Sequence, residues 1–242
     1  MKKKIIENIK TILYALIVAV VIRSFLFQPF YIPSSSMEPT LLIGDRLFVS
    51  KYAYGFSKHS LPFSPPITKK RFFEKIPERG DVIVFKTPAD NRTDYIKRLI
   101  GLPGDTIQFI NGTLYLNENA ILRNETKILD YVYCGNQKIT VNGFIETLPS
   151  GRKYLAIYNK EGTMLNTDKY IVPPKHYFFL GDNRDCSKDS RYLTSVGYVK
   201  DVNLVGEAKI LFFSNDKKKG NFFKFWKWRK SIRIDRFFRK IQ

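Results

Sequence analysis

The longest apolar stretch of the chain lies close to its amino end. Residues 11–22 (TILYALIVAVVI) carry no charge, and the apolar pattern continues to Gln28. Twelve helical residues span only about 18 Å, whereas the hydrocarbon core of a membrane is roughly 30 Å thick. A helix over 5–28 would reach about 36 Å and would end before Pro29. The pattern therefore predicts one tilted transmembrane helix over 11–28, which can start as early as residue 5.

Two other interpretations of this segment compete with a retained anchor. A cleavable signal peptide also has a basic start and a short apolar run, but no small-x-small site follows here, where the chain continues as Arg23-Ser-Phe-Leu. A helix buried in a soluble core would leave the clustered basic residues unexplained. Lys2, Lys3 and Lys4 precede the span and predict that residues 1–10 are a cytoplasmic N-terminus, with the body of the chain across the membrane.

Beyond residue 40 the pattern changes to short apolar runs separated by turn residues, which is typical of β-strands. The alternating segment 107–116 contains Asn111-Gly112 and predicts a β-hairpin, and Asn142-Gly143 predicts a second one. Residues 55–79 contain four prolines and predict a long surface loop. We expect strands over Arg46–Tyr52, Asp81–Lys86, Tyr95–Ile100, Tyr154–Tyr158, Tyr177–Leu180 and Leu204–Phe213.

These patterns predict four regions and a mainly β fold. Residues 1–10 form the basic N-terminus and residues 11–28 the anchor. Residues 29–215 form a β-rich ectodomain with a variable insertion near 111–169, and residues 216–242 form a basic aromatic tail.

The formal charge of +19 is concentrated at the two ends of the chain. Residues 1–10 contribute +3, and residues 217–242 contribute +10 because eleven Lys and Arg residues accompany one Asp. Only +6 remains for the 206 residues between them. This distribution favours membrane orientation and surface adhesion over a nucleic-acid groove. The aromatic residues of the tail do not share one helical face, so an amphipathic helix is not supported: Phe222, Phe223, Phe225, Trp226, Trp228, Phe237 and Phe238. Partition into lipid headgroups stays open, because Trp and basic residues both favour the headgroup zone, and a simple solvated tail stays open as well.

Cysteine and histidine are scarce, which excludes several kinds of site. Cys134 and Cys186 are too few for a disulfide scaffold and lack the spacing of zinc or thioredoxin motifs, so one bridge and two free thiols both remain open. His59 and His176 cannot build a histidine-rich metal site, and we expect no metal and no cofactor. No Gly-x-Ser-x-Gly elbow occurs, which disfavours a Ser-His-Asp hydrolase.

Three segments carry the side chains that indicate catalysis. Residues 32–41 (IPSSSMEPTL) place a serine cluster just after the anchor, and residues 94–105 (DYIKRLIGLPGD) and 181–192 (GDNRDCSKDSRY) follow. With these three motifs and the N-terminal anchor, the sequence resembles the bacterial type I signal peptidases (leader peptidases, peptidase family S26), membrane-anchored serine proteases with a Ser-Lys dyad. The resemblance covers about residues 28–54, 80–107 and 170–211.

The resemblance implies that Ser36 is the nucleophile and Lys97 the general base. It also implies that the Ser34 hydroxyl and the Ser36 backbone N–H stabilise the oxyanion, and that Ser187 holds the lysine amine. A lysine accepts the serine proton only as a free amine, and at an ordinary pKa near 10.4 only about 0.04% is neutral at pH 7. Burial must therefore lower the pKa of Lys97, and its apolar neighbours can supply that burial: Tyr95, Ile96, Leu99 and Ile100.

The same resemblance implies how the site is supported and what it cleaves. We expect Asp182 to pair with Arg98, and Asp189 with Arg191. Shallow apolar pockets would select small side chains at P1 and P3, the Ala-x-Ala rule of exported precursors, by overpacking against larger residues. The residues implied around these pockets are Phe30, Ile32, Leu41, Tyr95 and Ile96. Cys186 stands where family members usually carry Asn, a departure that touches none of the proposed catalytic groups.

The resemblance also implies an architecture, a location and partners. The ectodomain would be a signal-peptidase-like coiled antiparallel β-sheet. The enzyme would lie in the bacterial cytoplasmic (inner) membrane with its catalytic domain on the periplasmic face. Its substrates would be the signal peptides of exported precursor proteins. The lipid bilayer would be a second partner, with anionic phospholipid at the tail, and no nucleic acid is expected.

Other interpretations of the chain have less support. Ser150-Gly-Arg-Lys153 matches the Ser-x-x-Lys of penicillin-binding enzymes but lacks a Lys-Thr-Gly partner. Self-cleaving repressors use a Ser-Lys dyad but need a DNA-binding domain where this chain has an anchor. The non-enzymatic alternative is a membrane-tethered basic adaptor that binds anionic lipid or nucleic acid through residues 217–242, and it predicts no precursor cleavage.

Overall fold

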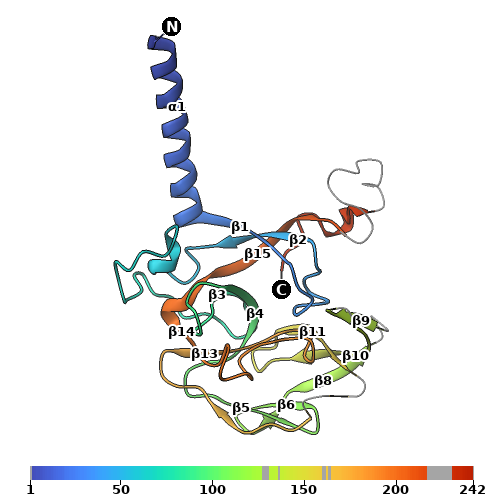
Figure 1. Ribbon diagram of the computed structural model, residues 1–242. Helices are drawn as coiled ribbons and strands as arrows, with labels where there is room; N and C mark the ends of the chain where they lie inside the picture. Colours follow the sequence, from blue (N-terminus) through green and yellow to red (C-terminus); the bar gives the residue numbers. More distant parts are fainter. Residues whose placement is uncertain are drawn as a thin grey trace.

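The computed structural model describes residues 2–126, 131–135, 137–159, 162, 165–216 and 231–241. Helix α1 (Lys2–Val21) continues into the π-helical turn η1 (Ile22–Leu26) and extends away from the body of the molecule (Figure 1). The segment Lys3–Leu26 is long and apolar enough to cross a membrane, and its apolar window is not buried against the body. These properties fit a membrane anchor.

The carboxyl end of the anchor differs from the predicted one. The helical segment ends at Leu26, and Phe27 already begins strand β1 (Phe27–Tyr31). β1 pairs with β2 (Asp45–Ser50) along its whole length. Pro29 therefore lies inside β1 instead of after the helix, and β1 is an edge strand, where a missing N–H is tolerated.

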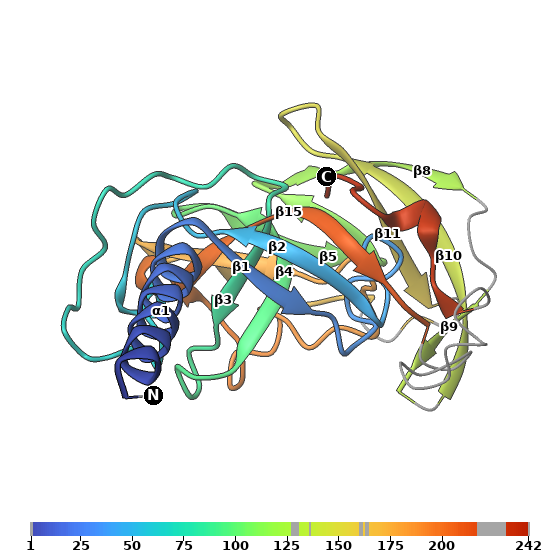
Figure 2. The same ribbon diagram turned by 90° about the horizontal axis from the view of Figure 1, so that it is seen from above.

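The described body is mainly β, which confirms the predicted fold class. Its strands pair antiparallel in three sheets, with the orders β1-β2-β15-β3-β4-β13-β14, β11-β10-β8 with β9 on β10, and β12-β5-β6-β7. The remaining strands are β3 (Val82–Lys86), β4 (Asp94–Gly101), β5 (Thr106–Ile110), β6 (Thr113–Leu116), β7 (Asn119–Ala120), β8 (Leu122–Thr126), β9 (Tyr131–Cys134), β10 (Gln137–Thr147), β11 (Lys153–Asn159), β12 (Tyr170–Ile171), β13 (His176–Leu180), β14 (Val199–Lys200) and β15 (Leu204–Ser214). Seen from above, α1 lies at one end of the body and β9 and β10 at the other (Figure 2).

The six predicted strands correspond to β2, β3, β4, β11, β13 and β15, and the first predicted hairpin is confirmed. β5 and β6 pair up to Ile110↔Thr113, and the two turn residues between them have positive φ angles, 49° at Asn111 and 71° at Gly112. Asparagine and glycine tolerate this left-handed conformation better than other residues, so the turn forms where the sequence places it.

The second predicted hairpin, at Asn142-Gly143, is wrong. Both residues lie in the middle of β10, which pairs with β8 on one side and β11 on the other. A Cβ atom at Gly143 would come within 2.8 Å of the Thr126 carbonyl oxygen. The glycine is therefore explained by the close approach of a neighbouring strand and not by a turn.

The loop over 55–79 contains a short helical turn, η2 (Lys58–Ser60), and the isolated bridge Phe56↔Phe72, but no strand or longer helix, in agreement with the predicted loop. Residues 217–230 lie outside the described residues, and with them much of the predicted aromatic pattern of the tail. The described end of the tail, 231–241, includes the helical turn η5 (Ile234–Arg236) and forms bridges Asn215↔Ile232 and Ile210↔Lys240 beside β15. This end packs on the body, unlike the solvated tail that the sequence left open.

Candidate active site

Ser36 lies in the turn that connects β1 to β2 and is held from two sides. Met37 and Leu41, which follow it, are fully buried in an apolar cluster with Val82 of β3. On the polar side, the Asn183 backbone N–H donates to the Ser36 carbonyl at 3.2 Å, and the Asn183 side chain donates to the Ser35 carbonyl at 3.2 Å. The first and third sequence motifs are thus joined at the serine.

Lys97 projects from β4, between β3 and β13, and meets Ser36. Its Nζ lies 2.7 Å from Ser36 Oγ and 2.8 Å from the Ile96 carbonyl oxygen. Both side chains are buried, with 3% of Lys97 and 7% of Ser36 exposed. The structure therefore brings together, across 61 residues of sequence, the two residues that the resemblance identified.

The environment of Lys97 favours its neutral form. Burial lowers the pKa of Lys97 from 10.5 to about 8, although the charges of Asp189 and Asp182 act in the opposite direction. With a pKa of about 8, roughly a tenth of the side chain is a free amine at pH 7. A buried lysine in contact with a serine hydroxyl can accept its proton.

Ser34 lies beside the reacting pair. Its Oγ is 3.4 Å from Ser36 Oγ, and the side chain is exposed at the wall of the cavity that also contains Ser36 and Lys97. Among the described residues, no acceptor bonds the Ser36 backbone N–H. The hydroxyl of Ser34 and this N–H are therefore both available to a ligand in the cavity.

Arg98 and Asp182 form a buried ion pair behind the lysine, as the resemblance implied. Arg98 Nε and Nη2 each lie 2.7 Å from a carboxylate oxygen of Asp182, and both residues are at most 1% exposed. Thr40 donates to the same carboxylate at 2.5 Å. This pair connects β4, the start of the third motif and the turn that carries Ser36, so it fixes three parts of the site relative to one another.

Asp189 and Arg191 form the second implied pair. Arg191 Nε and Nη2 lie 2.9 Å from the two carboxylate oxygens, and the Gly181 N–H donates to Asp189 at 3.0 Å. A Cβ atom at Gly181 would come within 2.4 Å of the Ser36 carbonyl oxygen and 2.2 Å of Ser187 Oγ. Only glycine allows this close approach of the third motif to the serine.

Ser187 differs from the expectation. Its side chain is buried against Gly181, and the described residues show no hydrogen bond between Ser187 and the Lys97 amine. The amine instead contacts Ser36 and the Ile96 carbonyl. A role of Ser187 in holding the amine stays a prediction.

A cavity of about 410 Å³ opens beside Ser36 and Lys97, with more apolar than polar surface. Four of the five implied pocket residues line it, namely Phe30, Ile32, Tyr95 and Ile96. Leu41 does not, because it is fully buried in the cluster beneath. The sequence missed further lining residues, among them Val84 of β3 and Cys186 and Lys188 of the third motif.

The two cysteines, which the sequence left open, form a disulfide bond. Cys134 at the end of β9 is joined to Cys186, with their Cα atoms 5.5 Å apart. The bond connects the insertion to the wall of the cavity beside Ser36. Within the described residues, no group of three or more His, Cys, Asp or Glu side chains could hold a metal ion.

A buried ion pair that the sequence missed supports the third motif from the other side. Arg184 Nη2 lies 2.6 Å from Glu146 Oε2 of β10, and Arg184 also bonds Tyr154 of β11 at 2.8 Å. Arg184 and Glu146 are each 1% exposed. Arg184 lies inside the third motif, but nothing in the sequence around Glu146 indicates that Glu146 is the partner of Arg184.

Comparisons with known proteins identify relatives of the chain. The family described as "Signal peptidase, peptidase S26" matches residues 5–213. The chain is 40% identical to signal peptidase I of Rickettsia conorii over 247 residues, covering 94% of this chain and 90% of that protein. It is 39% identical to signal peptidase I of Rickettsia typhi over 256 residues, covering 99% and 95%.

A solved structure is also similar in sequence. The crystal structure of a signal peptidase I from Enterococcus faecalis V583 is 29% identical, covers 55% of this chain and 97% of that one, and gives a TM-score of 0.32. The family match and the Rickettsia relatives span nearly the whole chain, including all three motifs. The chain therefore belongs to the signal peptidase family, peptidase family S26, whose members are serine proteases that remove signal peptides.

Proposed function

We propose that the chain cleaves signal peptides from exported precursors by a Ser-Lys mechanism. The observation that carries the proposal is the 2.7 Å contact between Lys97 Nζ and Ser36 Oγ, made by a lysine that is 3% exposed and has a pKa of about 8. Neutral Lys97 accepts the Ser36 proton as Oγ attacks the scissile carbonyl. The tetrahedral oxyanion that results accepts hydrogen bonds from the Ser34 hydroxyl and the Ser36 N–H.

Collapse of this intermediate breaks the peptide bond. The Lys97 ammonium gives its proton to the leaving amine, which departs as the new N-terminus of the mature protein, and the signal peptide stays esterified to Ser36. A water molecule then gives a proton to Lys97 as it attacks the ester. The second tetrahedral intermediate releases the signal peptide carboxylate, and the proton returns to Ser36.

A cleavage assay with a precursor protein tests this mechanism. Ser36→Ala and Lys97→Met remove the nucleophile and the base, and we expect both to lose cleavage. Lys97→Arg keeps the charge but cannot give up its proton, so we expect it to be inactive as well. The second Ser-Lys pair provides the matched control, because Ser150 and Lys153 are exposed near the start of β11. Ser150→Ala and Lys153→Met should cleave like the wild type, and cleavage by Ser36→Ala would refute the proposal.

We also propose that the cavity beside Ser36 selects small residues at P1 and P3. Its wall includes the apolar side chains of Phe30, Ile32 and Ile96. Larger side chains would be rejected by overpacking, a discrimination worth about 1 to 3 kcal/mol for one extra methylene. Ile96→Ala should therefore raise kcat/KM for precursors with valine at P1 relative to kcat/KM for precursors with alanine at P1. An unchanged Val/Ala ratio of kcat/KM would contradict this assignment.

The arrangement in the membrane is a further part of the proposal. Lys3 and Lys4 lie at the start of the helical segment, before the uncharged run 11–22, and the body follows the segment directly. We place the N-terminus in the cytoplasm and the β-rich body on the periplasmic face of the bacterial inner membrane. External protease added to intact spheroplasts should digest the body. Digestion only after the membrane is opened would refute this orientation.

A further inference from the structure

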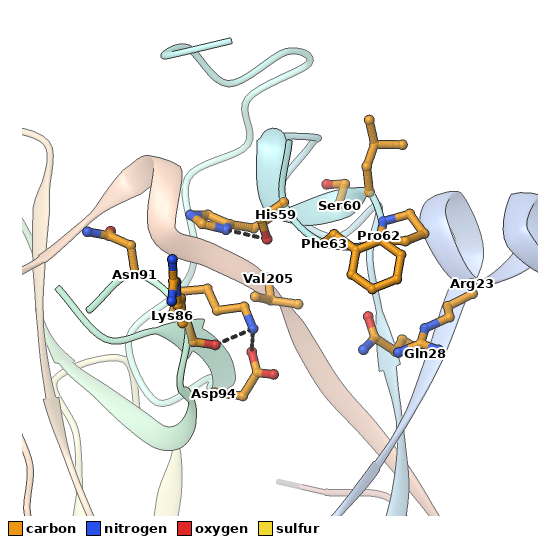
Figure 3. Close-up of a pocket in the computed structure, with 13 residues that line it drawn as sticks. Arg23, Gln28, His59, Ser60, Pro62, Phe63, Lys86, Asn91, Asp94 and Val205 are labelled. Carbon is orange, nitrogen blue, oxygen red and sulfur yellow. Dashed lines mark hydrogen bonds and ion pairs between the residues drawn. The ribbon is translucent and has the colours of Figure 1, made fainter. Parts of the chain in front are cut away.

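A second cavity, of about 420 Å³, lies where the anchor joins the body (Figure 3). We call it the interface pocket. One wall comes from the end of the anchor and β1, one from the loop 55–79, and one from the segment around Lys86 and Arg92. The pocket is lined by Arg23, Gln28, His59, Ser60, Leu61, Pro62, Phe63, Ser64, Lys86, Asn91, Arg92, Asp94 and Val205.

The interface pocket is cationic. Three basic side chains and one carboxylate line it, and the carboxylate of Asp94 lies 2.9 Å from the Lys86 amine. Among the described residues, neither Arg23 nor Arg92 has a carboxylate within ion-pair distance. Two guanidinium groups are thus available to an anion, and their planar donor sets suit phosphate oxygens.

His59 adds a donor that has no partner in the described chain. The residue is 4% exposed, its Nδ1 lies 2.9 Å from Ser64 Oγ, and its buried Nε2 makes no hydrogen bond to any described residue. Burial and nearby basic residues, Lys58 and Lys86 among them, lower the pKa of His59 to about 4, so the ring is neutral at pH 7. If Nδ1 accepts the Ser64 hydroxyl proton, Nε2 carries the ring proton and can donate it to a ligand.

The position of the interface pocket identifies the kind of ligand. Arg23 lies at the end of the membrane-crossing segment Lys3–Leu26, at the level of lipid headgroups. In Figure 3, Phe63 and Pro62 lie between the Arg23 and His59 sides of the pocket. Phe63 is fully exposed, and Ile67 of the same loop is 69% exposed. An amphiphile, with a phosphate beside apolar chains, matches this combination better than a free ion does.

We propose that the interface pocket binds the headgroup of an anionic phospholipid, with Arg23 on the phosphate at the membrane end of the pocket. Arg92 and the Nε2–H of His59 bind oxygen atoms farther along the headgroup, and Phe63 contacts the lipid chains. This inference does not depend on the proposed catalytic function. It also assigns anionic lipid to a site on the body, whereas the sequence pointed only to the tail.

Lipid binding to the full chain in nonionic micelles tests the proposal. Native mass spectrometry would compare three probes: dioctanoyl phosphatidylglycerol, dioctanoyl phosphatidylcholine and inorganic phosphate. We expect the anionic lipid to bind most tightly, because choline places a positive charge beside the two arginines. Arg92→Gln should weaken it about tenfold or more, the loss expected for one charge-assisted contact. Lys69→Gln removes an equal charge from the exposed loop outside the pocket and should leave binding unchanged.

A second pair of variants tests the histidine. His59→Gln keeps an N–H donor and should retain more lipid affinity than His59→Leu, provided that both variants keep the melting temperature of the wild type. If either variant has a lower melting temperature, Arg23→Gln replaces the pair and should weaken binding of the anionic lipid as Arg92→Gln does. Equal affinities for the two lipids, or equal effects of Arg92→Gln and Lys69→Gln, would overturn the proposal. Binding of inorganic phosphate as tightly as the anionic lipid would overturn the lipid assignment.

Discussion

Arg236, near the carboxyl end of the chain, forms a two-point ion pair with Asp45 at the start of β2. Its Nη2 and Nε lie 2.6 Å and 3.1 Å from the two carboxylate oxygens, and Asp45 is fully buried. Arg236 also donates to the Thr40 carbonyl at 2.9 Å, and Thr40 in turn bonds Asp182. The end of the tail, which lies beyond the residues of the family match, is thus joined to the turn that carries Ser36.

Loss of this contact should destabilise the body. Arg236→Met leaves the buried Asp45 carboxylate without its main partner. We expect the free energy of unfolding to fall by about 3 kcal/mol. This is the lower end for a broken buried ion pair, because Ser214 and Leu42 still donate hydrogen bonds to Asp45. Urea unfolding in detergent measures the change. Arg239→Met, at an exposed position in the same segment, is the control and should unfold like the wild type. Equal stability of the two variants would contradict the prediction.

The activity should increase with pH through the pKa of Lys97. This pKa is lowered to about 8, so the free amine that acts as base is the minor form at pH 7 and the major form at pH 9. We expect kcat/KM to rise about tenfold per pH unit below 8 and then level off. A profile that keeps rising to pH 10 would show that Lys97 has an ordinary pKa in the enzyme.

Folding stability should respond to the same group. The unfolded chain, with a lysine pKa near 10.5, binds more protons than the folded chain between pH 8 and 10.5. The contribution of Lys97 to stability therefore increases with pH across this range. Lys97→Met removes the titration, so the wild type should gain stability relative to this variant as the pH rises. A constant difference between the two would refute this linkage.

Removal of the Ser34 hydroxyl should slow the reaction and leave substrate binding intact. The group lies 3.4 Å from Ser36 Oγ, where it can reach the oxyanion that forms during attack. Loss of one such donor typically lowers kcat by about 10² to 10³. Ser34→Thr keeps a hydroxyl and should retain most of the activity, whereas Ser34→Ala should not. A change in KM alone for Ser34→Ala would exclude Ser34 from the oxyanion site.

The disulfide should stabilise the folded body. The bond between Cys134 and Cys186 closes a loop of 52 residues, which in the chain-entropy model corresponds to about 4 kcal/mol. Replacing both cysteines by serine should lower the free energy of unfolding in urea by that amount. Reductant should destabilise the wild type and have no effect on the double variant. If reductant affects both equally, its action does not pass through this bond.

Local sequence patterns predicted the strands and the first hairpin because short-range preferences and tertiary structure agree there. Asn111-Gly112 lies between two runs that pair with each other, so its turn preference is realised. Asn142-Gly143 has the same preference, but both flanks pair with other strands, β8 and β11. Which strand pairs with which is a long-range property, and a dipeptide does not encode it.

Only the site residues that lie in the sequence motifs could be predicted. Ser36 and Lys97 stand in recognisable segments, and the structure places them in contact. Leu41 belongs to the same segment as Ser36, but its side chain points into the core and not into the cavity. The sequence does not show in which direction a side chain of this turn points. The pairing of Asp45 with Arg236 spans 191 residues and carries no local pattern.

The direct junction between η1 and β1 has a geometric consequence. The π-helical turn ends at Leu26, and the paired strand begins at the next residue, so no flexible linker separates the membrane span from the sheet. Ser36 follows five residues after the end of β1. In the proposed membrane arrangement, β1 and the five residues after it set the height of Ser36 above the bilayer, and so fix how far from the membrane a bound peptide is cut.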